Sequence, residues 1–174
     1  MVKLIVPSGE YLDSYREAYR EYAEHGVSTY AFTDASACDV FAKFERYRNE
    51  RDLPPDRVGE DCYWLVDEEK GRFLGEIKIR HRLNEVLLRR GGHVGYGVRF
   101  SEWNRGYGTM MLALALEKAK EMRLSPVLVT CNDDNLASAK VIEKNGFVLE
   151  NKVTVADPQS GKESLIRWYW KTLP

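Results

Sequence analysis

The chain has 174 residues, in which 26 Lys and Arg are balanced by 27 Asp and Glu, giving a formal net charge of −1 at pH 7. A charge this close to neutral excludes a general electrostatic attraction to nucleic acid or to a membrane surface. The length suits one domain with a hydrophobic core of its own, so residues 1–174 are expected to form a single domain.

The sequence also argues against a membrane span, a secretory signal and a metal site. No apolar run approaches the roughly 18 residues of a membrane-spanning helix, and residues 1–7 are too short for a signal peptide. Cys38, Cys62 and Cys131 are odd in number and lack C-x-x-C spacing, which favours a reducing compartment over disulfides or zinc. We therefore expect a cytoplasmic protein without a metal.

The first half of the chain contains helical and strand-like segments. Ser8 can cap a helix that stops at Gly26, and tyrosines at helical spacing form its apolar stripe, which favours core packing. A proline-containing break precedes two strands joined by a charged turn. The expected elements are a strand at 3–6, helices at 8–25 and 40–47, and strands at 62–66 and 73–81.

In the second half, strands and helices alternate after a long loop. Adjacent strands early in the chain and strand–helix alternation later imply a mixed sheet with helices on both faces. The predicted fold class is therefore α/β, with a mixed sheet of α+β character. The expected elements are a strand at 93–100, a helix at 110–122, a strand at 127–131, a helix at 136–144, and strands at 147–155 and 163–169.

The most informative segment is the loop at 103–109, between a predicted strand and a predicted helix. Gly106 and Gly108 let the backbone approach a ligand, and the first N–H groups of a helix lack acceptors and favour an anion. The loop therefore predicts a phosphate site. A dinucleotide-binding loop would need glycine where Met111 stands, and a nucleoside-triphosphatase loop would need Lys where Thr109 stands. A strand–helix turn that binds nothing is the simplest alternative.

A second segment, at 127–147, helps to decide which ligand the loop at 103–109 binds. Together with the loop, this segment resembles the GNAT superfamily of acetyl-coenzyme A-dependent N-acetyltransferases. Members of that family carry an Arg/Gln-x-x-Gly-x-Gly/Ala loop that opens a helix, then a strand, an Asn-x-x-Ala/Ser helix and a Gly-Phe pair. The residues that match in type and spacing are Asn135, Ser138, Gly146 and Phe147.

The resemblance covers most of the chain from about Tyr63 onward. Segments 75–81 and 91–96 look like a little-characterised bacterial branch of predicted acetyltransferases. The GNAT fold implies a central mixed, mostly antiparallel splayed sheet flanked by helices. In that fold the strand ending at Phe100 and the strand starting near Val127 would diverge around the pantetheine arm of the cofactor.

The resemblance also implies where acetyl-coenzyme A binds. Its diphosphate would lie on the N–H groups of the loop, where Arg99 or Arg105 could add charge. Two positions depart from the family pattern, because Trp103 replaces the Arg/Gln and Ile142 replaces the Tyr that protonates the departing thiolate in many members. The implied cofactor-binding residues are Val98, Phe100, Arg105, Gly106, Tyr107, Gly108, Thr109, Asn135 and Ser138. Val98 and Phe100 would contact the pantetheine arm through main-chain groups, and Asn135 could also act as a helix N-cap.

Acyl transfer to an amine needs a general base, because an aliphatic ammonium has a pKa near ~10. His93 falls where related enzymes often place a catalytic Glu, and Glu76 and His81 on the preceding strand are further candidates. If paired residue numbers of the two strands sum to about 174, His81 lies opposite His93. The same register puts Ile79 opposite Gly95, and a shift of one residue would undo it. The two histidines could equally form a structural pair.

We therefore expect an N-acetyltransferase that transfers acetyl directly from acetyl-coenzyme A to a primary amine of a small molecule or peptide. No motif indicates the acceptor, and the protein could be a monomer or a homodimer. Two other classes stay open. One is a GNAT-fold module that binds an acyl-coenzyme A and senses it with weak turnover, which Ile142 favours. The other is a phosphate- or nucleotide-binding scaffold.

Overall fold

The computed structural model describes residues 1–27, 32–156 and 161–174. None of the helices in these ranges combines the length and the apolar character needed to cross a bilayer. The elements are β1 (Val2–Ile5), η1 (Gly9–Tyr11), α1 (Leu12–Glu24), α2 (Val40–Arg48), β2 (Glu60–Asp67), β3 (Arg72–Arg80), α3 (Glu85–Arg89), β4 (Val94–Val98), η2 (Phe100–Glu102), α4 (Tyr107–Glu121), β5 (Val127–Asn132), α5 (Leu136–Lys144), β6 (Val148–Ala156) and β7 (Glu163–Lys171), where η marks a short 3-10 helix.

The elements follow the predicted order, and α3 is an addition to it. This short helix lies inside the predicted loop at 82–92. The Asn84 side chain accepts a hydrogen bond from Leu87 N–H at 2.9 Å, which caps the helix. Asn84, a residue type that is preferred at the N-cap of helices, was the local signal for this helix.

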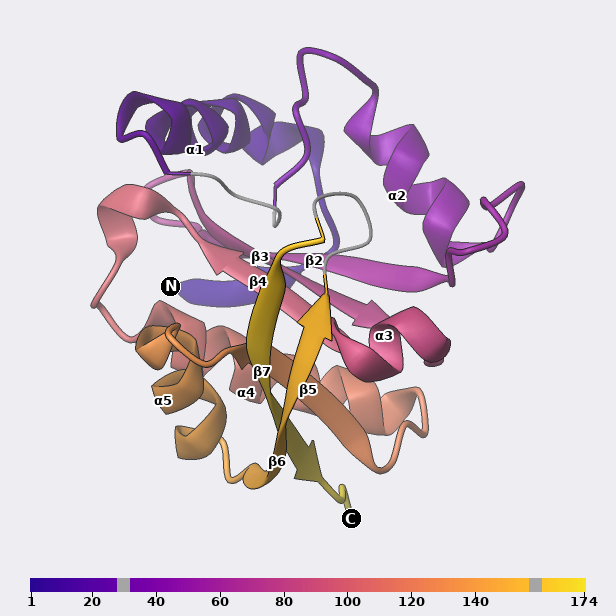
Figure 1. Cartoon of the computed structure of the whole chain (residues 1–174). Coiled ribbons are helices and arrows are strands. Elements are labelled where there is room, and N and C mark those ends of the chain that lie inside the picture. The colour runs from indigo at the N-terminus through magenta and orange to yellow at the C-terminus, as the bar shows by residue number, and fades with distance from the viewer. Residues whose placement is uncertain (28–31, 157–160) are drawn as a thin grey trace.

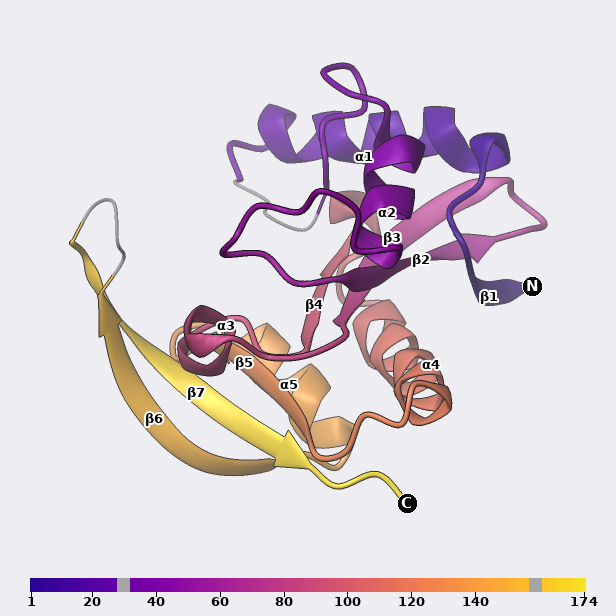
Figure 2. The ribbon, with the colours of Figure 1, turned by 90° about the vertical axis from the view of Figure 1, so that its right-hand side faces the viewer.

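The strands form two antiparallel sheets. The first has the order β1-β2-β3-β4 and the second has the order β5-β7-β6. Figure 1 and Figure 2 show α1 and α2 over one face of the first sheet and α4 over the other. α5 contacts α4 and β5. The predicted α/β class, with mostly antiparallel strands flanked by helices, is confirmed.

An apolar core lies on each face of the first sheet. On the α4 face, aliphatic side chains such as Ile77 and Leu112 are fully buried. On the α1 face the core is aromatic, with Tyr15 stacked on Trp64 at 4.6 Å between ring centroids. Tyr15 and Tyr22 from the predicted helical stripe are both buried, so their expected role in packing is confirmed.

β4 and β5 diverge from one short junction. A single isolated bridge joins Gly92 to Val129. Beside it, His93 N–H donates to the Leu128 carbonyl at 2.8 Å, and Leu128 N–H donates to His93 Nδ1 at 3.0 Å. Beyond this junction the two strands belong to different sheets, so the predicted splay is confirmed.

The register between β3 and β4 differs by one residue from the predicted one. Ile79 lies opposite Val94 instead of Gly95. Arg80 N–H donates to the His93 carbonyl at 2.8 Å, which fixes this register at the end of the ladder. The prediction was wrong because the connection between the strands contains a helix and two glycines with positive φ, whose geometry sets the register.

The shift separates the two histidines. His81 does not face His93, and its Nδ1 lies 2.9 Å from Glu50 Oε1. The predicted histidine pair at the hairpin base is therefore wrong.

His93 joins the two sheets through a neutral imidazole, because its Nδ1 accepts a hydrogen bond from Leu128. Burial, and then the charge of Arg80, lower the pKa of the imidazole from its usual value. Between this lowered pKa and about 6.5, the unfolded chain binds more protons than the folded chain. The stabilisation by His93 is therefore complete above about pH 6.5 and is lost as the pH falls.

We expect His93→Asn to keep the unfolding free energy of the parent protein near pH 8, because an amide oxygen can accept from Leu128 N–H. As the pH falls, this variant should lose less unfolding free energy than the parent, because it has no imidazole to protonate. His93→Ala should cost about 1–3 kcal/mol, because the buried Leu128 N–H loses its acceptor. Unfolding free energies from urea titrations between about pH 5 and pH 8 measure both effects. Equal acid losses in the parent protein and in His93→Asn would contradict this role.

Candidate functional site

A cleft of about 1290 Å³ runs along the outer edge of β4. Its walls come from α1, α2, the start of β2, β3, α3, β4, the first turn of α4 and one side of α5. The predicted cofactor-binding residues line it with two exceptions, Phe100 and Arg105. Neither of the predicted base candidates, His93 and Glu76, is among the residues that line it.

The predicted phosphate site lies at the start of α4, in residues 106–109, and is called the cradle below. Gly106 has a φ of +83°, which lets the chain turn into the helix, and no side chain caps the helix. Met110 N–H donates to the Gly106 carbonyl at 3.1 Å. The N–H groups of Tyr107, Gly108 and Thr109 precede this bond, and no acceptor for them is found among the described residues. These three donors and the helix dipole favour an anion here.

Gly108 lies where the cradle meets the rest of the cleft. A Cβ on Gly108 would lie 3.2 Å from Val141 Cγ2 and 3.6 Å from Val98 Cγ2. A side chain at this position would therefore fill space between α5 and β4, which explains the need for glycine.

The two predicted arginines differ in their contacts. Arg105 is exposed at the loop, and its Nη1 lies 3.2 Å from Glu102 Oε2. Arg99 instead points at α1, where Nε donates to Glu21 Oε1 at 2.7 Å and Nη1 donates to Ser14 Oγ at 2.9 Å. The suggestion that Arg99 adds charge at the diphosphate is therefore wrong.

Two lysines that the sequence analysis missed line the cleft. Lys140 and Lys144 lie four residues apart on α5, so they share a helix face near the cradle. Their spacing after Asn135, the residue that caps α5, was the available signal.

The carbonyl of Val98 lies at the edge of β4 that faces the cleft. Arg99 N–H donates to the Leu74 carbonyl on β3, so the alternate residue Val98 directs its main-chain groups to the opposite edge. The Val98 carbonyl accepts hydrogen bonds from Tyr22 Oη and, at 2.9 Å, from Trp103 Nε1. Trp103, which stands at the Arg/Gln position of the loop pattern, thus contacts the end of β4.

Phe100 lies outside β4, in the turn η2. Its ring stacks on His25 at 3.9 Å between centroids, and its carbonyl accepts from Trp103 N–H at 3.2 Å. The predicted main-chain contact of Phe100 with pantetheine stays a prediction.

Asn135 and Ser138 form the start of α5. Asn135 Oδ1 accepts from Ser138 N–H at 3.1 Å, which is the N-cap predicted as an alternative role for Asn135. Across the cleft from them, Tyr96 Oη lies 2.8 Å from Ser138 Oγ. Asn135, Ser138 and Tyr96 all line the cleft.

The two base candidates are engaged in other contacts. The Nδ1 lone pair of His93 accepts from Leu128 N–H, so Nε2 carries the proton in this arrangement. Glu76 is 1% exposed, and its Oε2 accepts from Trp64 Nε1 at 2.9 Å. Its Oε1 lies 3.0 Å from Lys78 Nζ. A base role for either residue stays a prediction.

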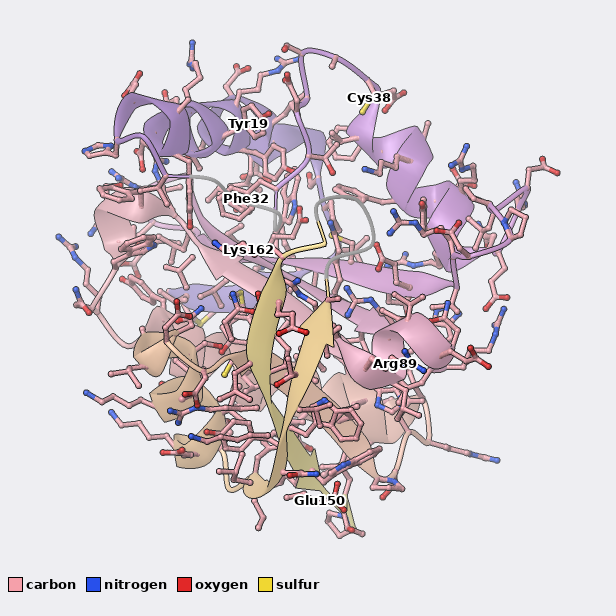
Figure 3. All side chains as sticks on the ribbon, in the orientation of Figure 1. Tyr19, Phe32, Cys38, Arg89, Glu150 and Lys162 are labelled. Atoms are coloured by element: carbon pink, nitrogen blue, oxygen red, sulfur yellow. The ribbon has the colours of Figure 1, made fainter. Side chains whose placement is uncertain are left out.

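The other half of the cleft is aromatic and charged. Figure 3 shows Phe32 below α1, on the side of the first sheet that α1 covers. Tyr22, Phe32 and Tyr47 line this half. Arg80 enters it from β3, and a Cβ on Gly95 would lie 3.3 Å from Arg80 Nη2. The bare glycine on β4 therefore leaves room for this guanidinium.

A family model described as an acetyltransferase (GNAT) domain matches residues 11–148 of the chain. The chain belongs to the GNAT acetyltransferase family. The family places it among the acyltransferases. No curated protein matches the sequence.

Solved GNAT structures share the fold over nearly the whole chain. The microcin C7 self-immunity acetyltransferase MccE, in complex with acetyl-CoA and AMP, aligns with a TM-score of 0.73 and 13% identity, covering 99% of this chain and 92% of that one. RimL, a ribosomal L7/L12 alpha-N-protein acetyltransferase in complex with coenzyme A, aligns with a TM-score of 0.70 and 12% identity, covering 99% of this chain and 94% of that one. The ribosomal-protein-S5-alanine acetyltransferase from Vibrio fischeri aligns with a TM-score of 0.70 and 16% identity, covering 98% of this chain and 92% of that one.

Glu76 and Lys78 make a buried ion pair whose loss can be measured. Glu76→Gln should lower the unfolding free energy by about 3 kcal/mol, because it removes the carboxylate charge that lies 3.0 Å from the buried Lys78 ammonium. Adding Lys78→Met should recover part of that loss. A double-mutant cycle in urea tests this, and losses that simply add would show that the two charges do not interact.

Proposed function

We propose that this GNAT protein transfers the acetyl group of acetyl-coenzyme A directly to a primary amine of a small molecule or peptide. The observation that carries the proposal is one continuous cleft. The cleft begins at the free N–H groups at the start of α4 and follows the edge of β4 that has no partner strand. It ends in the aromatic and charged half of the cleft beneath α1.

The residues present fit coenzyme A. The N–H groups of Tyr107, Gly108 and Thr109 would hold the diphosphate, and Lys140 and Lys144 would add positive charge. Acetyl-coenzyme A bound there supplies the thioester carbonyl that the amine attacks. The family match, and the neighbours that contain acetyl-CoA or coenzyme A, support this assignment.

A second candidate is a module that binds an acyl-coenzyme A and turns it over weakly. One observation favours it, because Ile142 is fully buried in the core at the position where many family members carry the acidic Tyr. Release of free thiol in the presence of an amine panel separates the candidates. An active transferase releases it at a rate that depends on the amine, and a sensor binds coenzyme A without this dependence.

The cradle predicts a defined effect of Gly108→Ala. The added Cβ should weaken coenzyme A binding at least about tenfold in calorimetry, because it enters the space beside the N–H donors. The double variant Gly108→Ala/Val141→Ala is the matched control, since it relieves the 3.2 Å contact with α5 and keeps the Cβ. Unchanged affinity in both folded variants would reject the cradle.

The base prediction can be separated from the structural role of His93. His93→Asn keeps an acceptor for Leu128 N–H but removes the imidazole. If His93 is the base, kcat/KM should fall about 10²-fold or more while coenzyme A affinity stays constant. Near-native turnover with an intact acidic limb in the pH–rate profile would assign the base elsewhere, and Glu76 would be tested next.

A further inference from the structure

Tyr96 spans the gap between β4 and α5. Its side chain starts on β4, and its hydroxyl lies 2.8 Å from Ser138 Oγ in the first turn of α5. The same hydroxyl lies 3.4 Å from the Ser138 carbonyl. Both residues line the cleft. A phenol is thus held between the two walls that enclose the proposed path of the pantetheine arm.

The hydroxyl of Tyr96 reaches the helix face that carries Ile142. Ser138 and Ile142 are four residues apart on α5, so their side chains are neighbours on one face. Ile142 is fully buried and offers no proton. A phenol from the opposite wall therefore lies one helical turn from the position that lacks one.

The position along β4 also fits contact with the reacting end of the cofactor. The cradle at α4 marks one end of the strand, and the His93–Leu128 junction closes the gap at the other. Tyr96 lies between Val98 and this closed end. An arm that enters from the cradle and runs along the open edge of β4 brings its sulfur toward Tyr96.

Tyr96 is protonated at neutral pH. Burial raises the pKa of its phenol above the ordinary value of about 10, and the hydrogen bond with Ser138 acts in the opposite direction. The Ser138 hydroxyl can donate to the phenolic oxygen at 2.8 Å, and the phenolic proton, which the structure directs at the Ser138 carbonyl over a long 3.4 Å contact, can turn from it toward the sulfur.

We propose that Tyr96 protonates the departing sulfur and that Ser138 positions its hydroxyl, an inference that rests on the proposed acetyl transfer. As the C–N bond forms and the C–S bond breaks, the C–S electron pair passes to sulfur, which takes the phenolic proton of Tyr96. The acceptor ammonium loses two protons in becoming an amide. One of them restores the phenol, and the other leaves to solvent.

Tyr96→Phe tests the proposal, because it keeps the ring and removes only the hydroxyl. We expect kcat to fall about 10²-fold while coenzyme A affinity changes less than about threefold. The pKa of the thiol of bound coenzyme A, followed by thiolate absorbance, should rise, because the thiolate loses a hydrogen-bond donor. Ser138→Ala should lower kcat less than Tyr96→Phe does.

Tyr63→Phe is the matched control, because Tyr63 is a partly buried tyrosine on β2 that packs against the α4 core and does not line the cleft. It should leave both readouts unchanged. An unchanged kcat or an unchanged thiol pKa in Tyr96→Phe overturns the proposal. Tyr107 also lines the cleft, so a fall in kcat in Tyr107→Phe without a fall in Tyr96→Phe would assign the proton to Tyr107 and overturn the proposal as well. If the parent protein acetylates no amine, the proposed function fails first, whereas a normal parent and a normal Tyr96→Phe reject only the role of Tyr96.

Discussion

The divergence of β4 from β5 is the constraint on which the site depends, because it leaves one edge of β4 without a partner strand. The two hydrogen bonds between His93 and Leu128 hold the strands together at one end, and the two sheets separate from there. Buried main-chain groups need partners. In the described structure the Val98 carbonyl finds them in Tyr22 and Trp103. A ligand that runs along this edge can offer the same kind of hydrogen bonds.

A second set of contacts couples the two halves of the cleft. Arg99, directly after β4, is 4% exposed and donates to Glu21 on α1. Glu21 also accepts from the N–H of Ser101 at 3.1 Å, and its neighbour Tyr22 bonds to Val98. These hydrogen bonds therefore hold the end of α1 against the end of β4, the strand along which the cofactor would lie.

Several groups that look catalytic in the sequence stabilise the architecture in the fold. The Nδ1 of His93 accepts from β5, and Glu76 shares its carboxylate between Trp64 and Lys78. Such buried groups are costly unless they are paired, and pairing leaves them less free to exchange protons with a substrate. Tyr96 differs from them, because it lines the cleft and the partner of its hydroxyl is another hydroxyl.

The sequence by itself determined the order of the elements, the loop that opens α4 and the cap of α5. These features follow from local rules: glycine where φ is positive, an Asn side chain three residues before an N–H donor, and apolar spacing along each element. It could not determine the register of β3 on β4, because a shift of one residue depends on the geometry of the connection through α3. Only the tertiary structure decided the partners of His93, Glu76 and Arg99 and the contact of Tyr96 with Ser138. Each of these contacts joins residues brought together by the pairing of strands or the packing of a helix on a sheet, which local sequence does not specify.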